Sequence, residues 1–504
     1  MSGVFRDRLS AANTWRNLSA EELRTLARHD EVPNRQGVAV YHSRIRSRSA
    51  ARTYVVQEPD ERVAQQMSEV RDYLQSADLL MVDQEICSHP DNRFRVRYYV
   101  TRPYARLAHM MRRNMFDPTE RDPEPDIVVV QVPEWPELGI YVHPAPDEHK
   151  VYTYVLGSDY YGEAKMGSLR AAMHLMREHR DGLGIHAASK LFHLQGERGS
   201  QTRGALVFGL SGTGKTTIGL SEHGLRSPEG ITVLQDDINM LTAAGYTYGT
   251  EKAFYVKTDG ITGQPTLLGA AQQPEAIAEN VWVTEDGRLD FDNWTLTTNG
   301  RAVVQRWAIP HTGGDAVDLA RVDVIFFVTR RHELPPVGRL TSPAQAAAFL
   351  MLGESTFTSA DDPARAGQSQ RVVGFDPFIL GEHHRQGEFL YRFLSQNPQV
   401  RVHLLNTGTV GGLEGGVKIP PAVTLRAVEL VMRDEVRWHL DDVLGYETPL
   451  GLAGVDLDLY DPYRIYGGAA VYGELLETVR LERVAWLEQF PELPAAIRMA
   501  VDGR

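Results

Sequence analysis

The stretch from Gly209 to Thr216, GLSGTGKT, combines residue types that can bind phosphate groups. Its glycines let successive backbone N–H groups turn toward one anion without a clash from Cβ. Lys215 supplies a positive charge for the β- and γ-phosphates, and the Thr216 hydroxyl can bind the magnesium ion that bridges them. We therefore expect ATP and Mg²⁺ to bind here, with the Lys215 side chain facing solvent until the ligand arrives.

The expected nucleotide contacts cover this whole loop and the residue after it. They are Gly209, Leu210, Ser211, Gly212, Thr213, Gly214, Lys215, Thr216 and Thr217. The apolar segment GALVF before the loop predicts a buried strand, and a helix should follow with its positive end toward the phosphates. Gly219 predicts that this helix is short. The alternative, a glycine-rich turn without a ligand, is disfavoured by the preceding strand.

An acidic pair, Asp236 and Asp237, follows the apolar segment ITVLQ. A carboxylate at the end of a neighbouring strand is where a nucleotide site holds its metal ion. Paired acids seen alone more often form a solvated turn or a helix cap. Beside a phosphate loop, the sequence favours a metal ligand.

Length and composition limit the range of functions. A chain of 504 residues is too long for one hydrophobic core, and its net charge of −13 argues against a general nucleic-acid or membrane-surface role. The single cysteine, Cys87, excludes an intrachain disulfide and fits a reducing compartment. An apolar signal-peptide core and an apolar run of about 18 residues are both missing, so we expect a cytoplasmic location. The expected partners are a nucleotide and an unidentified acceptor, a small metabolite or a protein, with the oligomeric state open.

The elements that must position these residues alternate between strands and helices, which indicates an α/β fold. Ser19 and Glu22 have the spacing of a capping box at the start of a helix over 19–31. Strands are expected at 93–100, 126–133, 184–194, 204–210, 323–329 and 400–406, and helices at 101–116, 166–180 and 342–352. The polar segment 177–184 is the expected boundary between an N-terminal α/β domain, 1–180, and a nucleotide-binding domain, 181–504, that carries the phosphate loop 209–216.

The phosphate loop followed by the acidic pair closely resembles the ATP-dependent phosphoenolpyruvate carboxykinases. Further segments occur in the order of that family: RSRSAARTYVV, YYGEAKMGSLRAAM, GIHAAS, YVKT, ENVWVTEDGRLDFD, LPPVGRLTSPAQAAAFLMLGES and GVDLDLYDP. The resemblance runs from residue 17 to residue 465. It implies a two-domain fold with a phosphate-loop nucleotide-binding C-terminal domain. It also implies the conversion of oxaloacetate and ATP to phosphoenolpyruvate, ADP and carbon dioxide, with Mg²⁺ on the nucleotide and a separate Mn²⁺.

The resemblance also assigns roles on the acceptor side. Arg48 matches an arginine that contacts the substrate carboxylate, and Tyr160 matches an active-site tyrosine. Lys165 matches the first of two adjacent lysines. Arg339, in PPVGRLT, matches an arginine that bridges the substrate and the γ-phosphate. On sequence alone each of these could serve packing or solvation, and their occurrence in the family's order favours the functional interpretation.

Metal and nucleotide contacts complete the set of expected site residues. His186 and Asp237 match two manganese ligands, although a histidine on an apolar strand is more often a core residue. Lys257, in YVKT, matches a nucleotide-contacting lysine. Lys418 stands where the family has an arginine near the nucleotide, and Thr424 corresponds to a residue near the adenine.

Departures from the family concentrate on the metal and acceptor side. Met166 replaces the second lysine, a manganese ligand, and a thioether is a soft ligand that suits Mn²⁺ or Mg²⁺ poorly. Ala187 and Ala188 replace a Cys-Ser pair, and Arg48 is followed by SAAR where the family has SPKD. These changes predict a weakened Mn²⁺ site and slow conversion of oxaloacetate.

Three functions therefore remain open. The first is an ATP-dependent phosphotransferase with a divergent acceptor site, in which Asp236 or His186 would serve as the base for a hydroxyl acceptor. The second is a genuine ATP-dependent carboxykinase that tolerates the changes. The third is a nucleotide-binding sensor or scaffold without turnover.

Overall fold

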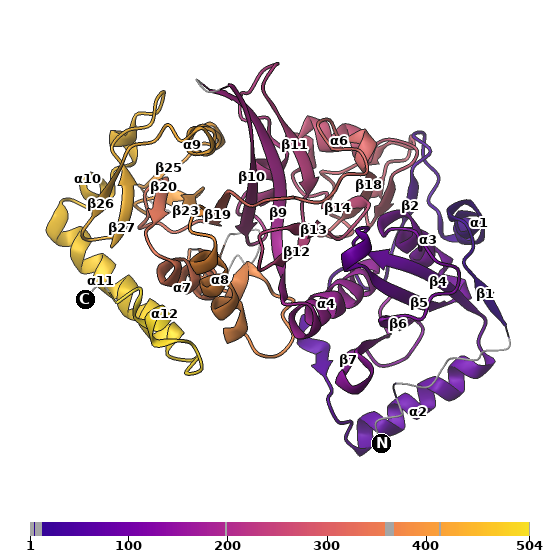
Figure 1. Cartoon of the computed structure of the whole chain (residues 1–504). Helices are drawn as coiled ribbons and strands as arrows, with labels where there is room; N and C mark the ends of the chain where they lie inside the picture. The colour runs from indigo at the N-terminus through magenta and orange to yellow at the C-terminus, as the bar shows by residue number, and fades with distance from the viewer. Residues whose placement is uncertain (1–4, 6–12, 197–198, 358–366, 413–414, 503–504) are drawn as a thin grey trace. The chain divides into compact units, whose positions relative to one another are not determined.

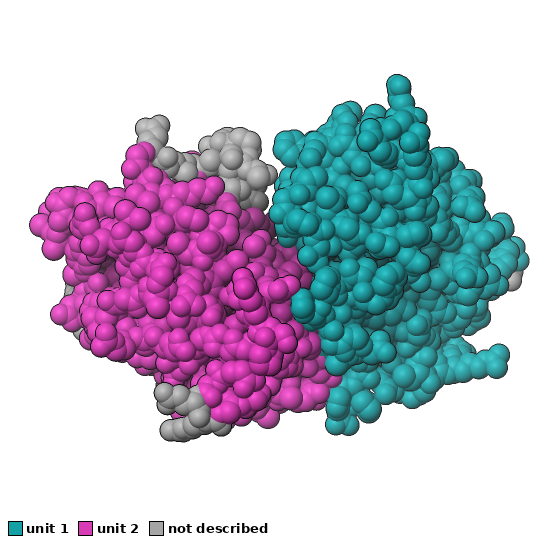
Figure 2. Space-filling model, turned by 90° about the horizontal axis from the view of Figure 1, so that it is seen from above, with its two compact units in different colours: residues 1–180, 250–317 teal, residues 181–249, 318–504 magenta. Residues whose placement is uncertain are grey.

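The computed structural model describes residues 5, 13–196, 199–357, 367–412 and 415–502, which form two compact units (Figure 2). Unit 1 comprises 1–180 and 250–317, and unit 2 comprises 181–249 and 318–504. The sequence-based division placed all of 181–504 in one domain. Segment 250–317 instead belongs to unit 1, because its strands form a sheet with a strand from the N-terminal part of the chain.

A seven-stranded mixed sheet is the centre of unit 1 (Figure 1). Its order is β1 (Thr14–Arg16), β4 (Leu79–Ile86), β5 (Phe94–Thr101), β6 (Ile127–Val132), β8 (Lys150–Leu156), β7 (Gly139–Ala145) and β3 (Thr53–Val55). Helix α2 (Glu61–Ser76) buries Met67, Val70 and Leu74 in the core on one face of this sheet. Helix α4 (Tyr161–His179) packs on the other face. A Cβ added to its Gly167 would lie 3.1 Å from the Thr153 side chain, so the small residue permits the close approach.

The second sheet of unit 1 joins distant parts of the chain. Its order is β14 (Ala253–Lys257), β18 (Arg301–Gln305), β15 (Ile277–Glu279) and β2 (Ala39–Tyr41). The pairing of β2 with β15 is parallel. This pairing is the physical reason that 250–317 belongs to the N-terminal unit. Helices α1 (Ala20–Leu26), α3 (Ala105–Asn114) and α6 (Pro265–Ala271) complete unit 1.

Unit 2 is built on a ten-stranded sheet. The order is β13 (Thr247–Gly249), β12 (Ile238–Thr242), β9 (Gly182–Gly196), β10 (Gly199–Gly209), β19 (Val324–Thr329), β23 (Arg401–Asn406), β20 (Val337–Leu340), β27 (Tyr446–Pro449) and β26 (Trp438–Asp441), with β11 (Gly230–Gln235) also paired to β9. Strands β10, β19 and β23 are parallel neighbours, so their carboxyl ends lie at one edge of the sheet. The phosphate loop leaves the sheet at that edge.

The core of unit 2 packs helices against this sheet. Helix α7 (Pro343–Leu352) has eight buried residues, and it contacts α8 (His384–Gln396), α11 (Ala469–Leu487) and α12 (Ala495–Met499). Phe208, Phe327, Phe349 and Phe389 belong to the same apolar core. The other helices of unit 2 are α5 (Lys215–Leu220), α9 (Pro421–Arg433) and α10 (Pro462–Ile465). The remaining short strands are β16 (Trp282–Val283) and β17 (Leu289–Asp290) in unit 1, and β21 (Glu354–Thr356), β22 (Ser369–Arg371), β24 (Thr409–Val410) and β25 (Val417–Lys418) in unit 2.

The α/β class is confirmed, and most predicted elements occur with shifted ends. The capping box of α1 is formed, with the Glu22 N–H donating to Ser19 Oγ and the Ser19 N–H donating to Glu22 Oε2. The predicted helix ends early, at Leu26, and a 3₁₀ turn follows over Ala27–Asp30. Strands β9 and β10 are longer than predicted, because their cross-strand pairing continues as far as Gly196 and Gly199. Within the described ranges, every helix is too short or too polar to cross a membrane.

Candidate nucleotide and metal site

The phosphate loop connects β10 to α5 in unit 2, as the motif requires. Gly212 and Gly214 have φ angles of 75° and 97°, a region that favours glycine. A Cβ on Gly209 would lie 2.6 Å from Thr213 Oγ1, so only glycine fits at the end of β10. The Thr213 hydroxyl donates to the Leu210 carbonyl (2.8 Å), and the Thr407 hydroxyl donates to the Thr213 carbonyl (2.6 Å). The loop is therefore closed on itself and tied to the segment that follows β23.

Lys215, His186 and Asp237, three of the expected site residues, lie close together in unit 2. Lys215 Nζ lies 2.7 Å from His186 Nε2 and 3.9 Å from Asp237 Oδ1, and His186 Nε2 lies 3.2 Å from Asp237 Oδ1. Lys215 is only 8% exposed, so the expectation of a solvent-facing side chain was wrong. The reason is that the Lys215 ammonium group contacts the imidazole of His186 and the carboxylate of Asp237 instead of water.

The tautomer of His186 follows from its two neighbours. Nδ1 lies 2.7 Å from the Phe375 carbonyl oxygen, which can only accept, so Nδ1 carries the proton. In the neutral ring Nε2 is then an acceptor, which matches the ammonium donor of Lys215. A neutral histidine whose second nitrogen is fixed by a carbonyl is also the form that binds a metal ion.

Asp376 is a fourth polar group near this cluster, and the sequence analysis missed it. It is buried, and its Oδ1 accepts from the Phe378 N–H at 2.8 Å. Burial raises the pKa of Asp376 to about 6, and the charge of Lys215 acts to lower it. Its Oδ2 has no hydrogen-bond partner among the residues that the structure describes. Asp376 belongs to no phosphate-loop or metal motif, so only the fold could have indicated it.

The other predicted residues of the loop differ in exposure. Ser211, Gly212 and Thr217 are exposed, and Thr216 is partly exposed. Asp236 is buried between β11 and β12, and its N–H donates to Gln235 Oε1 at 3.2 Å. The exposed part of the loop can meet a ligand directly.

Lys165, a predicted acceptor-side residue of unit 1, lies against the ring of Tyr255. Lys165, which is 1% exposed, has its Nζ 3.2 Å from Glu251 Oε2 and 5.3 Å from the centroid of the Tyr255 ring. The guanidinium carbon of Arg301 lies 5.6 Å from the same centroid. Two cations therefore approach one aromatic ring, and the charge of Lys165 is partly neutralised by Glu251.

Arg301 is connected to Tyr160 through Asn299. Arg301 donates to Asn299 Oδ1 at 2.9 Å, and Asn299 Nδ2 donates to the Tyr160 hydroxyl oxygen at 3.3 Å. The sequence analysis missed Arg301, Asn299 and Tyr255. A single arginine in TTNGR carries no recognisable spacing, and the common ring that it shares with Lys165 is visible only in the structure.

The loop that carries Arg48 is held by buried carboxylates of unit 1. The backbone N–H groups of Arg44 and Ile45 donate to Asp159 at 3.0 and 2.9 Å, and the Ser49 N–H donates to Glu163. Burial raises the pKa of Glu163, and the charge of Arg48 counteracts that rise. Met166, in helix α4 next to Lys165, is 4% exposed.

Three further predicted nucleotide contacts are distributed over the two units. Lys257 belongs to unit 1, where it pairs with Arg301 in the β14–β18 register and has its Nζ 3.1 Å from Asp259 Oδ2. In unit 2, Lys418 is exposed on β25. Thr424 of α9 is buried, and its hydroxyl has no hydrogen-bond partner within the described ranges.

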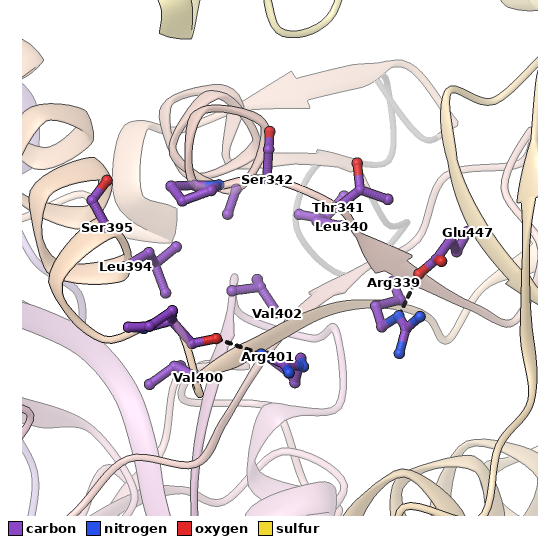
Figure 3. Close-up of a pocket in the computed structure, with 13 residues that line it drawn as sticks. Arg339, Leu340, Thr341, Ser342, Leu394, Ser395, Val400, Arg401, Val402 and Glu447 are labelled. Carbon is purple, nitrogen blue, oxygen red and sulfur yellow. Dashed lines mark hydrogen bonds and ion pairs between the residues drawn. The ribbon is translucent and has the colours of Figure 1, made fainter.

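The structure does not bring Arg339 to the phosphate loop. Arg339 forms an ion pair with Glu447, and its guanidinium carbon lies 5.2 Å from the centroid of the Trp438 ring. Together with Arg401 and Val402 it also lines a cavity of about 410 Å³ (Figure 3). Arg339 lies opposite His403 on β23, whereas the phosphate loop contacts Thr407, beyond the other end of that strand. Four residues of extended chain separate these points by about 13 Å.

Among the described residues no cluster of three or more His, Cys, Asp or Glu side chains could hold a metal ion. Beside the phosphate loop, His186 and Asp237 provide a nitrogen and an oxygen donor 3.2 Å apart. The ammonium of Lys215 is a cation held by these two groups, so their arrangement suits a positive charge.

Comparison with known proteins gives matches over most of the chain. A family model described as phosphoenolpyruvate carboxykinase matches residues 12–458. The phosphoenolpyruvate carboxykinase (ATP) of Aeropyrum pernix is 39% identical over 456 residues, which cover 90% of each chain. The enzyme of that name from Shouchella clausii is 29% identical over 68% of this chain and 62% of its own. The glycosomal enzyme of Trypanosoma cruzi is 28% identical over 71% and 75%.

Proposed function

Because the chain belongs to the phosphoenolpyruvate carboxykinase family, and is therefore an enzyme, we propose that it converts oxaloacetate and ATP to phosphoenolpyruvate, ADP and carbon dioxide. Identity of 39% over 90% of both chains to a relative named for this ATP-dependent reaction supports the proposal. The same similarity favours a genuine carboxykinase over a phosphotransferase with a different acceptor. ATP and oxaloacetate would then be its ligands, in the cytoplasm.

The convergence of Lys215 with His186 and Asp237 at the phosphate loop is the observation that carries the proposal. Backbone N–H groups of the loop and the Lys215 ammonium would bind the β- and γ-phosphates. The Thr216 hydroxyl would bind the magnesium ion of the nucleotide. Lys215 would exchange its contact with His186 for one with phosphate.

His186 and Asp237 would hold the second metal ion. Their donor atoms suit Mn²⁺, and the Lys215 ammonium shows that a cation can be held between them. A bound Mn²⁺ would supply positive charge that stabilises the developing enolate. The carbonyl of Phe375 keeps His186 in the tautomer that this role needs.

Unit 1 would bind the carboxylic acid. Arg48 and Arg301 supply guanidinium groups that suit carboxylate and phosphate oxygens. Tyr160, held by Asn299, offers a hydroxyl group next to Arg301. Lys165 would contribute positive charge, reduced by its contact with Glu251.

A second candidate function rests on Met166. This buried thioether stands where the family has a lysine ligand, so the Mn²⁺ site would have fewer protein donors and lower affinity. In that case the protein would transfer phosphate from ATP to another acceptor. For a hydroxyl acceptor, Asp236 or His186 would serve as the base.

A coupled assay for phosphoenolpyruvate separates the two functions. The purified protein is supplied with saturating oxaloacetate, ATP, Mg²⁺ and Mn²⁺. Turnover of about 10 per second, an ordinary rate for an enzyme, is expected for a carboxykinase. Absence of phosphoenolpyruvate together with ADP release in the presence of another acceptor would establish the second function instead.

A further inference from the structure

Strand β9 lies along the phosphate-loop helix α5, and three alternate residues of β9 meet it. His186, Ala188 and Lys190 point to the same face of the strand, because side chains two residues apart share a face. His186 contacts Lys215, the first residue of α5. Ala188 lies beside Gly219, where an added Cβ would be 3.2 Å from the Ala188 Cβ. The face of β9 therefore follows α5 from its first residue toward its last.

Lys190 makes the third contact, at the carboxyl end of α5. Its Nζ donates to the carbonyls of Ile218 (3.0 Å) and Ser221 (2.7 Å) and lies 5.1 Å from the Phe192 ring centroid. The side chain is 1% exposed, and burial lowers its pKa well below the ordinary value. None of the described carboxylates lies within ion-pair distance of it. The partial negative charge at a helix end is thus its main electrostatic compensation.

His223 extends this contact to a second helix. Its Nε2 lies 3.1 Å from the Ile218 carbonyl, which Lys190 also contacts, and its Nδ1 lies 3.1 Å from the Leu425 carbonyl of α9. Burial lowers the pKa of His223 to about 3, so the ring is neutral at ordinary pH and donates a hydrogen bond to one of these two carbonyls while only touching the other. The end of α5 is connected in this way both to β9 and to α9.

A helix as short as α5 is not stable by itself and depends on contacts with the rest of unit 2. It has six residues, and isolated helices shorter than about 12 residues are marginal in water. The surrounding contacts must therefore fix the direction of its first N–H groups and of Lys215. Lys190 is the only charged side chain of the described residues that donates to the last carbonyls of α5.

We propose that Lys190 is a positioning residue for nucleotide binding. Its hydrogen bonds to the Ile218 and Ser221 carbonyls fix the phosphate-loop helix α5 against strand β9. This inference rests on the proposed nucleotide site and deepens it. Lys190 touches no substrate and acts only through α5. Its loss should weaken ATP binding while leaving the affinity for oxaloacetate unchanged.

Calorimetry with Mg-ATP tests the inference without any turnover. Lys190→Met keeps an apolar stem and removes both hydrogen bonds, so the dissociation constant should rise at least about tenfold. Lys190→Arg keeps the donors and should stay within about threefold of the wild type. The matched control is Lys252→Met, a partly buried lysine of unit 1 that donates to Asp117, which should bind Mg-ATP normally. In the steady state, the KM for ATP should rise in Lys190→Met and the KM for oxaloacetate should not.

A second pair of variants changes the packing of α5 on β9 at Gly219 of the helix. Gly219→Ala should push α5 away from Ala188 and weaken Mg-ATP binding, and Ala188→Gly in the same protein should restore it. These two variants test the role of the α5–β9 contact if Lys190→Met does not fold. Wild-type affinity in folded Lys190→Met, or in folded Gly219→Ala when the first variant does not fold, would overturn the inference. A wild-type protein that binds no Mg-ATP would overturn the proposed nucleotide site itself.

Discussion

The ammonium nitrogen of Lys215 lies 2.7 Å from Nε2 of His186, so the lysine of the phosphate loop contacts strand β9 in the sheet of unit 2. Asp237 is 3.9 Å from the same nitrogen. The residue expected to meet phosphate and the residues expected to meet a metal ion are therefore in contact with one another. ATP would separate them by drawing Lys215 toward its phosphates.

Lys215→Met should weaken Mg-ATP binding at least about tenfold, because it removes a charge-assisted contact with the phosphates. Calorimetry on the folded variant measures this, with Lys252→Met as the control lysine. Unchanged affinity would rule out the phosphate loop as the nucleotide site.

The same Lys215→Met protein should bind Mn²⁺ in the absence of ATP at least as tightly as the wild type. The reason is that a competing ammonium group leaves the vicinity of His186 and Asp237. Electron paramagnetic resonance of free Mn²⁺ during a titration gives the affinity. Weaker binding in the variant would mean that Lys215 assists the metal ion instead of competing with it.

Asp237→Asn should lower turnover at least tenfold at limiting metal concentration, a rise in the barrier of about 1.4 kcal/mol. The change keeps the shape of the side chain and removes its negative charge. Asp181→Asn, which alters an exposed ion pair with Arg392 in the same unit, is the control and should keep its activity. Full activity of Asp237→Asn would exclude Asp237 as a metal ligand.

Buried Glu279 should make unit 1 less stable as the pH rises. Burial raises its pKa from 4.5 to about 7, although Arg106 acts in the opposite direction. Between these two values the folded state keeps a proton that the unfolded state has lost, so the free energy of unfolding falls with increasing pH. The total loss is about 3 kcal/mol and is complete above pH 7.

Glu279→Gln cannot ionise and should remove this pH dependence. Urea midpoints at pH 5 and pH 8 should therefore differ less in Glu279→Gln than in the wild type. An equal difference in both proteins would assign the pH dependence to other groups.

Arg483→Met should destabilise unit 2 by about 3 kcal/mol, because it leaves the Glu354 carboxylate buried without its closest cation. Burial alone would raise the pKa of Glu354, but Arg483 and Arg331 hold it below the ordinary value. Arg480→Met, on the same helix, removes an exposed pair with Glu477 and a partly buried pair with Asp502, and should reduce stability much less than Arg483→Met. Urea denaturation of both variants compares them directly.

Local signals in the sequence predicted the parts of this molecule that depend on local chemistry. The capping box of Ser19 and Glu22, the glycines of the phosphate loop and the strand before it were all expected, because each depends on neighbouring residues. The proximity of His186 to Lys215 could be inferred through the family resemblance. The sequence contains no comparable signal for Asp376, Arg301 or Asn299, whose positions depend on packing between distant segments.

Two expectations were wrong for the same reason. Lys215 was expected to face solvent, and 250–317 was expected to lie in the nucleotide-binding domain. Both depend on long-range contacts, with His186 and Asp237 in the first case and with β2 in the second. Composition and periodicity describe a residue and its neighbours, and they do not identify a partner far away in the chain.

The parallel pairing of β2 with β15 also has a consequence for biosynthesis. Residues 39–41 must find residues 277–279, and the part of the chain made between them includes the phosphate loop and much of the sheet of unit 2. A ribosome adds only about 5–20 residues per second, so the first strand waits many seconds for its neighbour. During that interval β2 is an unpaired strand on a nascent chain. The N-terminal unit can therefore complete its folding only after a large part of the other unit has already been translated.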